Sequence, residues 1–355
     1  MPKRLVYVIA GEPSGDLLGG PLVESLLAFG VQVSGIGGQS MKFHGLDSLF
    51  DMSELSIGGI TEVIPRVFSI KKLISATIAD ILQKKPNVVV TIDSPEFCFR
   101  VAKKIKKKDP SIRLVHYVAP SVWAWRPGRA KKMAPVYDHV LTLFDFEPKY
   151  FIPHGLQATF VGHQACINFS TCEKKRNNQI LILPGSRPQE IKRLLPIFMK
   201  AALNFGENII IPTLPHLVQL IKEISPNSIT ETDNETKNRL FQEAKCAIAA
   251  SGTVTLELAL SGCPMVVAYK ISPVSFAILK RLVRTRFISL VNIIAEKEVV
   301  KELIQGECTP ENILKSLQKL DSQKQIAEFK KLKNKLINEG KTPTNIATEV
   351  VLSYL

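Results

Sequence analysis

The stretch Leu5-Val-Tyr-Val-Ile-Ala-Gly-Glu-Pro-Ser-Gly-Asp16 decides the fold, together with its counterpart Ile180-Leu-Ile-Leu-Pro-Gly-Ser-Arg-Pro188 in the second half of the chain. Each begins with an uninterrupted apolar run, passes through a glycine-containing turn and enters a helical pattern. An apolar run without polar alternation is typical of a strand in a parallel sheet that is covered on both faces. The repetition predicts an α/β protein of two Rossmann-like domains, each opened by one strand–turn–helix unit.

Further short apolar runs alternate with helical patterns, as in parallel α/β domains. The predicted strands are Leu5–Ile9, Val88–Ile92, Leu114–Val118, Val140–Leu143, Ile180–Leu183, Ile209–Ile211, Ala247–Ala249 and Met265–Ala268. The predicted helices include Asp16–Phe29, Ile70–Gln83, Phe97–Lys107, Gln189–Asn204 and Thr253–Leu260.

The polar segment Asn168–Asn178 has no periodicity and is interpreted as a linker. We therefore expect an N-terminal domain over 1–167 and a C-terminal domain over 168–339. The tail after Pro310 is helical and either caps the second domain or crosses back to the first, and a C-terminal helix at about 340–355 is expected to pack back onto the first domain. Ligands of such sheets bind beyond the carboxyl ends of the strands, so we expect the chemistry in a cleft between the two domains.

Composition and charge limit the partners, the metal sites and the membrane contacts that this chain is expected to have. The 355 residues carry 46 Lys and Arg against 32 Asp and Glu, a net charge of +14 that suits nucleic acid, anionic lipid or phosphorylated substrates without choosing among them. The six cysteines form no C-x-x-C pair, which predicts reduced thiols and no zinc site. We find no signal peptide and no uncharged run of about 18 apolar residues, and we expect a cytoplasmic protein whose contact with a membrane is peripheral.

The second glycine turn, Gly185-Ser186-Arg187, predicts a phosphate site. It lies between an apolar strand and a helix that begins at Pro188, so backbone N–H groups, the helix dipole and a guanidinium converge on it. The alternative is that Arg187 is a solvated surface arginine.

A second turn of this kind follows the strand that ends at Ala249. Ser251, Gly252 and Thr253 present hydroxyls and amides at the start of a helix, and Glu257 follows one turn later. The Glu257 carboxylate suits the hydroxyls of a ribose; a solvated helix glutamate is an equally open interpretation.

Two acidic residues follow strands of the first half. Asp93 ends an apolar strand and suits a general base, although it also suits a local cap. Gly11–Gly15 permits a close approach to a ligand; alternatively it is an ordinary turn with Asp16 as a helix cap.

The segment His116–Arg126 contains both tryptophans, Trp123 and Trp125, which either line a pocket or anchor a loop. His163 is expected where the domains join, most often as a structural histidine. Two basic and apolar stretches, Phe97–Arg113 and Leu279–Phe287, and the apolar Val63–Ile81 suit an anionic membrane, with a solvated helix face as the alternative for each.

Together these residues resemble lipid-A-disaccharide synthases. The matches follow in order from about residue 8 to residue 305, and the Trp-Ala-Trp-Arg segment is highly specific. They are Gly11-Glu-Pro-Ser-Gly-Asp, Ile92-Asp-Ser-Pro-Glu-Phe, Tyr117-Val-Ala-Pro-Ser-Val-Trp-Ala-Trp-Arg, Phe160-Val-Gly-His, Leu183-Pro-Gly-Ser-Arg, Ala250-Ser-Gly-Thr, Pro264-Met-Val-Val-Ala-Tyr and Ser289-Leu-Val-Asn.

The resemblance implies a GT-B fold, with two parallel sheets facing across a cleft, and an inverting hexosyltransferase that needs no metal or other cofactor. It implies condensation of UDP-2,3-diacylglucosamine with 2,3-diacylglucosamine 1-phosphate through a β-1,6 bond, a step of lipid A biosynthesis on the inner face of the Gram-negative inner membrane. The expected partners are these substrates and an anionic membrane surface, without nucleic acid; a homodimer stays open.

Residue roles follow from the same resemblance. Asp93 matches the family's essential aspartate and is expected to be the base for the acceptor hydroxyl, with Gly15 and Asp16 on the acceptor side. The residues expected to bind the nucleotide and its phosphates are Gly185, Ser186, Arg187, Ser251, Gly252, Thr253, Glu257 and Asn292.

Three positions depart from the family pattern: Cys98 replaces Asn, and Asp145 and Val291 each replace Pro. Asp93 and Arg187 themselves keep the family pattern.

Two other functions compete with this interpretation. One is a UDP-GlcNAc epimerase, or a GT-B transferase with a soluble acceptor; the Trp-Ala-Trp segment and the basic amphipathic stretches argue against it. The other is a nucleic-acid-binding protein that uses the +14 charge, but the sequence shows no such motif and no stacking aromatics among its basic residues.

Overall fold

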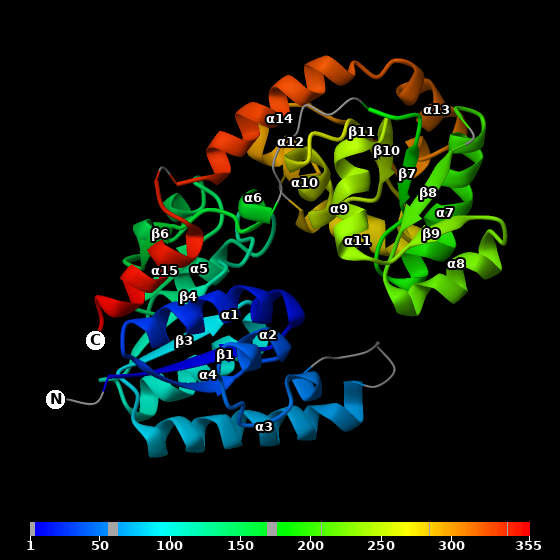
Figure 1. Ribbon diagram of the computed structural model, residues 1–355. Helices are drawn as coiled ribbons and strands as arrows, with labels where there is room; N and C mark the ends of the chain where they lie inside the picture. Colours follow the sequence, from blue (N-terminus) through cyan, green and yellow to red (C-terminus); the bar gives the residue numbers. More distant parts are fainter. Residues whose placement is uncertain (1–3, 56–62, 169–175, 207, 284, 339) are drawn as a thin grey trace. The chain divides into compact units, whose positions relative to one another are not determined.

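The computed structural model describes residues 4–55, 63–168, 176–206, 208–283, 285–338 and 340–355, and only the backbone of 63–68, 168 and 278–280. The chain divides into two compact units, each built on its own sheet (Figure 1). Unit 1 comprises Met1–Gln164 and Leu336–Leu355, and unit 2 comprises Ala165–Lys335. These boundaries lie a few residues before the predicted ones. Most of the predicted linker, and Cys172 with it, lies outside the described residues.

Unit 1 contains a six-stranded sheet in the order β2-β1-β3-β4-β5-β6, and every neighbouring pair is parallel. From β1 the chain moves outward to β2 and returns to the other side of β1 as β3. The order therefore reverses between β1 and β3, which makes this point the expected ligand position of the sheet. The strands are β1 (Leu5–Ala10), β2 (Gln32–Ile36), β3 (Val88–Ile92), β4 (Arg113–Tyr117), β5 (His139–Thr142) and β6 (Gln157–Phe160).

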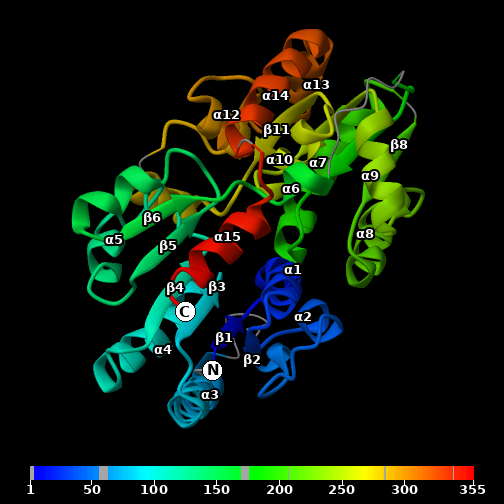
Figure 2. The same ribbon diagram turned by 60° about the vertical axis from the view of Figure 1, so that its left-hand side comes forward.

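Helices cover both faces of this sheet (Figure 2). Val6 and Val8 of β1 share a core with α1 and α15, whereas Tyr7 and Ile9 face the core formed with α3 and α4. The last helix, α15, thus packs in unit 1 against α1. The helices are α1 (Pro13–Ala28), α2 (Gln39–Phe43), α3 (Val63–Lys84), α4 (Pro95–Lys108), α5 (Gly128–Met133) and α15 (Pro343–Leu352), with 3-10 turns η1 (Met52–Leu55), η3 (Pro148–Tyr150) and η4 (Ile152–His154).

Unit 2 repeats the plan with the parallel order β12-β11-β10-β7-β8-β9, which reverses between β7 and β10. The strands are β7 (Ile180–Leu183), β8 (Ile209–Pro212), β9 (Ile229–Glu231), β10 (Cys246–Ala249), β11 (Met265–Tyr269) and β12 (Lys301–Ile304). The helices are α6 (Ala165–Asn168), α7 (Pro188–Leu203), α8 (Val218–Ile224), α9 (Asn234–Glu243), α10 (Thr253–Leu260), α11 (Pro273–Leu282), α12 (Leu290–Ala295), α13 (Pro310–Gln318) and α14 (Ser322–Leu336), with η5 (Pro215–Leu217) and η6 (Gln305–Glu307).

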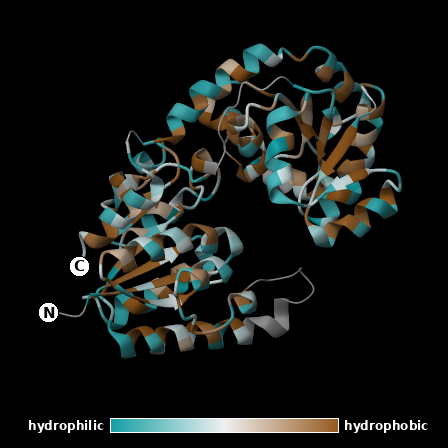
Figure 3. Ribbon diagram, viewed as in Figure 1, coloured by the Kyte–Doolittle hydropathy of each residue, from teal (hydrophilic) through white to brown (hydrophobic). Residues whose placement is uncertain are grey.

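All eight predicted strands are confirmed, with bounds within one residue. The four strands that the apolar runs did not predict are β2, β6, β9 and β12, and these are the outermost strands of the two sheets. Apolar residues concentrate on the strands of both sheets, with hydrophilic residues on the outer helix faces (Figure 3). Among the helices in the described ranges, none is both long enough and apolar enough to cross a bilayer.

Candidate active site

Asp93 lies directly after β3, at the point where the sheet of unit 1 reverses. It and Ser94 have φ values of +52° and +41°, a left-handed conformation that is strained for residues other than glycine and often accompanies function. The half-buried carboxylate accepts hydrogen bonds from the Ser14 hydroxyl (2.7 Å) and the Ser94 N–H (2.9 Å). An ionised carboxylate accepts about four hydrogen bonds, so Asp93 keeps capacity for a substrate hydroxyl.

The turn after β1 packs against the turn that holds Asp93. A Cβ on Gly11 would lie 2.6 Å from the Ser94 Oγ, and a Cβ on Gly15 would lie 3.0 Å from the Ile92 carbonyl oxygen. Glycines at both positions therefore allow the two turns to touch. Burial, and then the charge of Asp93, raise the pKa of Glu12 in the same turn.

Asp16 has a structural role that differs from the prediction of an acceptor-facing side chain. It is buried, and its carboxylate accepts backbone N–H groups of Gly38 (2.7 Å), Ser40 (2.8 Å) and Met41 (3.1 Å). Asp16 therefore holds the loop after β2 and caps α2, a helix other than its own. Of the two residues predicted on the acceptor side, Gly15 alone lies against the Asp93 turn.

In unit 2, the predicted phosphate turn lies between β7 and α7. Gly185 has a φ of +110°, and a Cβ there would lie 2.3 Å from the Glu190 carboxylate. That carboxylate accepts the Arg187 N–H (3.3 Å) and the Tyr269 hydroxyl (2.9 Å). Burial and then Glu190 raise the pKa of Tyr269 to about 12, so the phenol remains a donor. Glu190 thus fixes the turn, a role that the sequence reasoning missed.

The polar groups of this turn point outward. The Ser186 side chain is exposed, and the Arg187 side chain is 80% exposed, with its guanidinium 3.7 Å from a Glu190 oxygen. An ion pair at this distance and exposure contributes little to stability, so the guanidinium can turn from Glu190 to an arriving phosphate.

The turn after β10 lies beside the turn between β7 and α7. Leu183 pairs with Ala249, and the Ala250 N–H donates to the Leu183 carbonyl, so the N-termini of α7 and α10 emerge at one edge of the sheet. Gly252 and Thr253 are exposed there. Two neighbouring helix N-termini, with the positive ends of both helix dipoles and exposed side chains around them, form a site suited to a diphosphate.

Ser251 and Glu257 are both partly engaged within the protein. The Ser251 hydroxyl donates to the Ile288 carbonyl (2.8 Å), which leaves its oxygen free to accept. The Glu257 carboxylate lies 3.4 Å from the Lys237 ammonium, and both side chains are partly exposed. Glu257 is therefore not a freely solvated glutamate, and Lys237 is a neighbour that the sequence pattern did not indicate.

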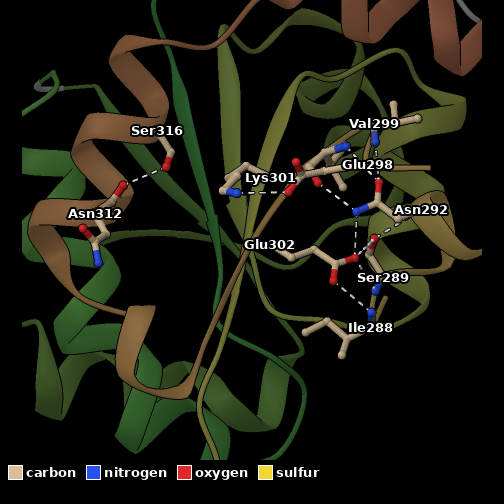
Figure 4. A network of polar contacts seen from close by, with 10 residues as sticks. Ile288, Ser289, Asn292, Glu298, Val299, Lys301, Glu302, Asn312 and Ser316 are labelled. Carbon is tan, nitrogen blue, oxygen red and sulfur yellow. Dashed lines mark hydrogen bonds and ion pairs between the residues drawn. The ribbon is translucent and has the colours of Figure 1, made fainter. Parts of the chain in front are cut away.

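Asn292, expected at the nucleotide, is buried, and its side chain is used in hydrogen bonds within the protein (Figure 4). Its amide donates to the Val300 carbonyl and the Glu302 carboxylate (2.8 Å each) and accepts from the Val299 and Val300 N–H groups. Glu302 in turn accepts the Ile288 N–H (2.9 Å). Since the Ile288 carbonyl accepts from the β10 turn, Asn292 supports the predicted nucleotide site from behind.

The two tryptophans of unit 1 have different roles. Trp123 Nε1 donates to the buried Glu147 carboxylate (3.0 Å), which also accepts the Leu143 and Phe144 N–H groups, so Trp123 anchors its loop. Trp125 is 40% exposed beside Arg126.

The side chain of His163 stacks on Phe144, and burial lowers its pKa to about 4, which suits a structural histidine.

Several solved structures share this fold. The chain is similar to Staphylococcus aureus MnaA solved with UDP (TM-score 0.66, 12% identity, 98% of this chain and 95% of that one). It is also similar to the Acinetobacter baumannii MurG (0.59, 16%, 99% and 100%) and to the UDP-GlcNAc 2-epimerase of Methanocaldococcus jannaschii, solved with UDP-GlcNAc and UDP (0.64, 13%, 99% and 100%). The fold is therefore of the GT-B type.

Sequence comparison identifies the family. The family model described as lipid-A-disaccharide synthetase matches residues 6–353. Lipid-A-disaccharide synthases of Rhodospirillum centenum and Ruegeria pomeroyi are 38% identical over 383 residues and 40% identical over 382 residues, covering 100% and 99% of this chain and 96% and 95% of theirs. The chain belongs to the lipid-A-disaccharide synthetase family, which places it among the glycosyltransferases of lipid A biosynthesis.

Glu147 generates a testable pH dependence. Burial raises its pKa to about 7, so the folded protein holds a proton that the unfolded chain releases near pH 4.5. Its stabilising contribution is therefore complete at low pH and is lost as pH rises through about 7, a change on the order of 3 kcal/mol. We expect Glu147→Gln to flatten the fall in the free energy of unfolding between pH 5 and 8, measured by urea denaturation.

The matched control is Asp145→Asn, which removes an exposed carboxylate from the same turn and should leave that slope unchanged. An equal slope in wild type and Glu147→Gln would contradict the assignment.

Proposed function

We propose that this protein transfers the 2,3-diacylglucosaminyl group of its UDP derivative to the 6-hydroxyl of 2,3-diacylglucosamine 1-phosphate. The products are UDP and a β-1,6-linked disaccharide 1-phosphate. The observation that carries the proposal is the chemistry at the two points of strand reversal, in a chain that matches one family over residues 6–353. Unit 1 presents a fixed carboxylate, and unit 2 presents two helix N-termini and an exposed guanidinium. We assign the acceptor to unit 1 and the UDP-sugar to unit 2.

In this proposal Asp93 is the general base. Its carboxylate takes the proton of the acceptor hydroxyl as the oxygen attacks the anomeric carbon from the face opposite UDP, which inverts the configuration. Two hydrogen bonds, from the Ser14 hydroxyl and the Ser94 N–H, hold the carboxylate in one orientation. Fixed orientation supports proton transfer because the base need not be ordered during the reaction.

The leaving UDP gains negative charge as its bond to the sugar breaks. Arg187, Ser186 and the N-termini of α7 and α10 stabilise that charge, since donors that are already in place cost little reorganisation. Glu257 accepts the ribose hydroxyls, and Asn292 acts indirectly by holding the segment that the Ser251 hydroxyl contacts.

Family membership favours this transferase over an epimerase. The UDP-GlcNAc 2-epimerases among the structural neighbours share 12–13% identity and support the fold alone. Identity to the synthases is 35–40% over nearly the whole chain.

The first test is incubation with both acylated substrates, with UDP and the disaccharide detected by mass spectrometry. We expect wild type to form both products and Asp93→Asn to fold normally while turnover falls by roughly 10²–10⁴, the usual contribution of a general base. Asp47→Asn, at an exposed position of the same unit, is the control. Near-normal turnover in Asp93→Asn would remove the base assignment, and UDP-GlcNAc epimerisation without disaccharide would favour the competing enzyme.

The second test concerns the donor side. Arg187→Ala removes the guanidinium that would donate two hydrogen bonds to the diphosphate. We therefore expect the Kd of UDP to rise roughly tenfold to a hundredfold, measured by calorimetry. Lys192→Ala removes a positive charge from an exposed position of the same helix and should change the Kd little. Equal UDP affinity in wild type and Arg187→Ala would count against the site.

We also propose peripheral binding to an anionic membrane, which the acylated substrates require. The apolar face of α4 lies in the core, so this helix offers only charge: Lys103, Lys104, Lys107 and Lys108 are exposed. In unit 2, Leu282 and Val283 are exposed beside Arg281. Some side chains of the predicted stretches lie outside the described residues, namely those of 63–68, with Arg66 among them, and those of 278–280.

Flotation with vesicles that contain phosphatidylglycerol tests the charge on α4. Each surface lysine contributes about 1 kcal/mol, so changing the four exposed lysines to Gln should reduce binding more than tenfold. Unchanged flotation, or equal binding to purely zwitterionic vesicles, would refute this role of α4.

A further inference from the structure

Two arginines and one glutamate meet beside the carboxyl ends of β3 and β4. Arg129 Nη2 lies 3.2 Å from Glu96 Oε1, and Arg126 Nη1 lies 3.8 Å from the same oxygen. Two guanidinium groups thus share one carboxylate, which leaves one positive charge unneutralised within the trio. The Glu96 side chain is 66% exposed and the Arg129 side chain 17% exposed, so the anion is the solvated, weakly held partner.

The fold holds this arginine pair in place. The loop that presents Arg126 is anchored by Trp123 on the buried Glu147. The Arg126 guanidinium lies 4.3 Å from the centre of the Trp125 ring, and its backbone has a φ of +52°. A stacked guanidinium on a strained residue is typical of a functional position more than of a solvated surface arginine.

Arg129 lies on the core side of the pair. After burial, its charge is the second cause that lowers the pKa of His116, in β4, to about 3. The arginine is therefore close to the end of the sheet, and the pair presents a partly buried and a more exposed fork side by side. Guanidinium forks match phosphate oxygens with parallel hydrogen bonds, which an ammonium group cannot do.

We infer that Arg126 and Arg129 bind the phosphate monoester of the sugar acceptor, with Glu96 as the resident anion that the phosphate displaces. This inference rests on the proposed function, in which the acceptor carries a 1-phosphate and a reacting 6-hydroxyl on one ring. Glu96 lies three residues beyond Asp93, so the carboxylate that pairs with both arginines belongs to the same turn as the base. The carboxylates of Asp93 and Glu12 repel a phosphate, which leaves the arginine pair to receive it.

The test compares Arg126→Gln and Arg129→Gln with a control, Arg100→Gln. Arg100 is an exposed arginine on α4, the helix that carries Glu96. Turnover is measured with the 1-phosphorylated acceptor and with its phosphate-free analogue. We expect the KM for the phosphorylated acceptor to rise roughly tenfold to a hundredfold in the first two variants, with the KM for the UDP-sugar unchanged. The preference for the phosphorylated acceptor should fall by the same factor, and the control should match wild type.

A second readout does not need turnover. Phosphorus NMR follows glucosamine 1-phosphate added to the full-length protein; we expect a saturable shift with wild type that weakens at least tenfold in Arg126→Gln. Arg126 is mostly exposed, so Arg126→Gln should fold. If Arg129→Gln does not fold, the result for Arg126→Gln is the deciding one.

Equal binding in wild type and Arg126→Gln, or an unchanged acceptor preference, overturns the inference. An absence of disaccharide from wild type would instead refute the proposed function.

Discussion

Both halves of this protein depend on one constraint, the reversal of strand order in a parallel sheet. In unit 1 the order reverses between β1 and β3, and in unit 2 between β7 and β10. At each reversal the two flanking turns run in opposite lateral directions, so they leave room for a ligand beyond the strand ends. The turns that follow these four strands contain almost every residue expected to act on the substrates. The chemistry differs because one pair of turns ends in a carboxylate and the other in exposed donors.

Buried or half-buried carboxylates fix the loops around these edges. Asp16 holds the loop after β2, Glu147 the loop after β5, Glu190 the phosphate turn and Glu302 the segment behind the β10 turn. Each accepts at least one backbone N–H group, and a buried N–H group without a partner costs about 1–3 kcal/mol. These side chains shape the loops of the candidate site through hydrogen bonds within the protein.

Continuous apolar runs predicted the eight inner strands because each is covered on both faces. The outermost strands β2, β6, β9 and β12 are partly exposed, so their sequences are mixed and resemble loops. The candidate site followed the same rule. Asp93 stands directly after an apolar strand and Arg187 lies in the short turn after another, so the positions of both were predictable. The pairs Glu190–Tyr269 and Glu147–Trp123 join residues 79 and 24 positions apart, which no local pattern reveals. Asn292 was expected at the nucleotide, but burial and four internal hydrogen bonds make it a support.

Hydrogen exchange with and without UDP tests whether the edge between β7 and β10 binds the nucleotide. Backbone N–H groups at the starts of α7 and α10 should exchange more slowly when they bind a diphosphate. We predict that UDP protects peptides covering 184–191 and 250–258, while peptides covering 11–16 and 93–98 are unchanged. Protection confined to the β1 and β3 turns, with none at the β7 and β10 turns, would contradict it.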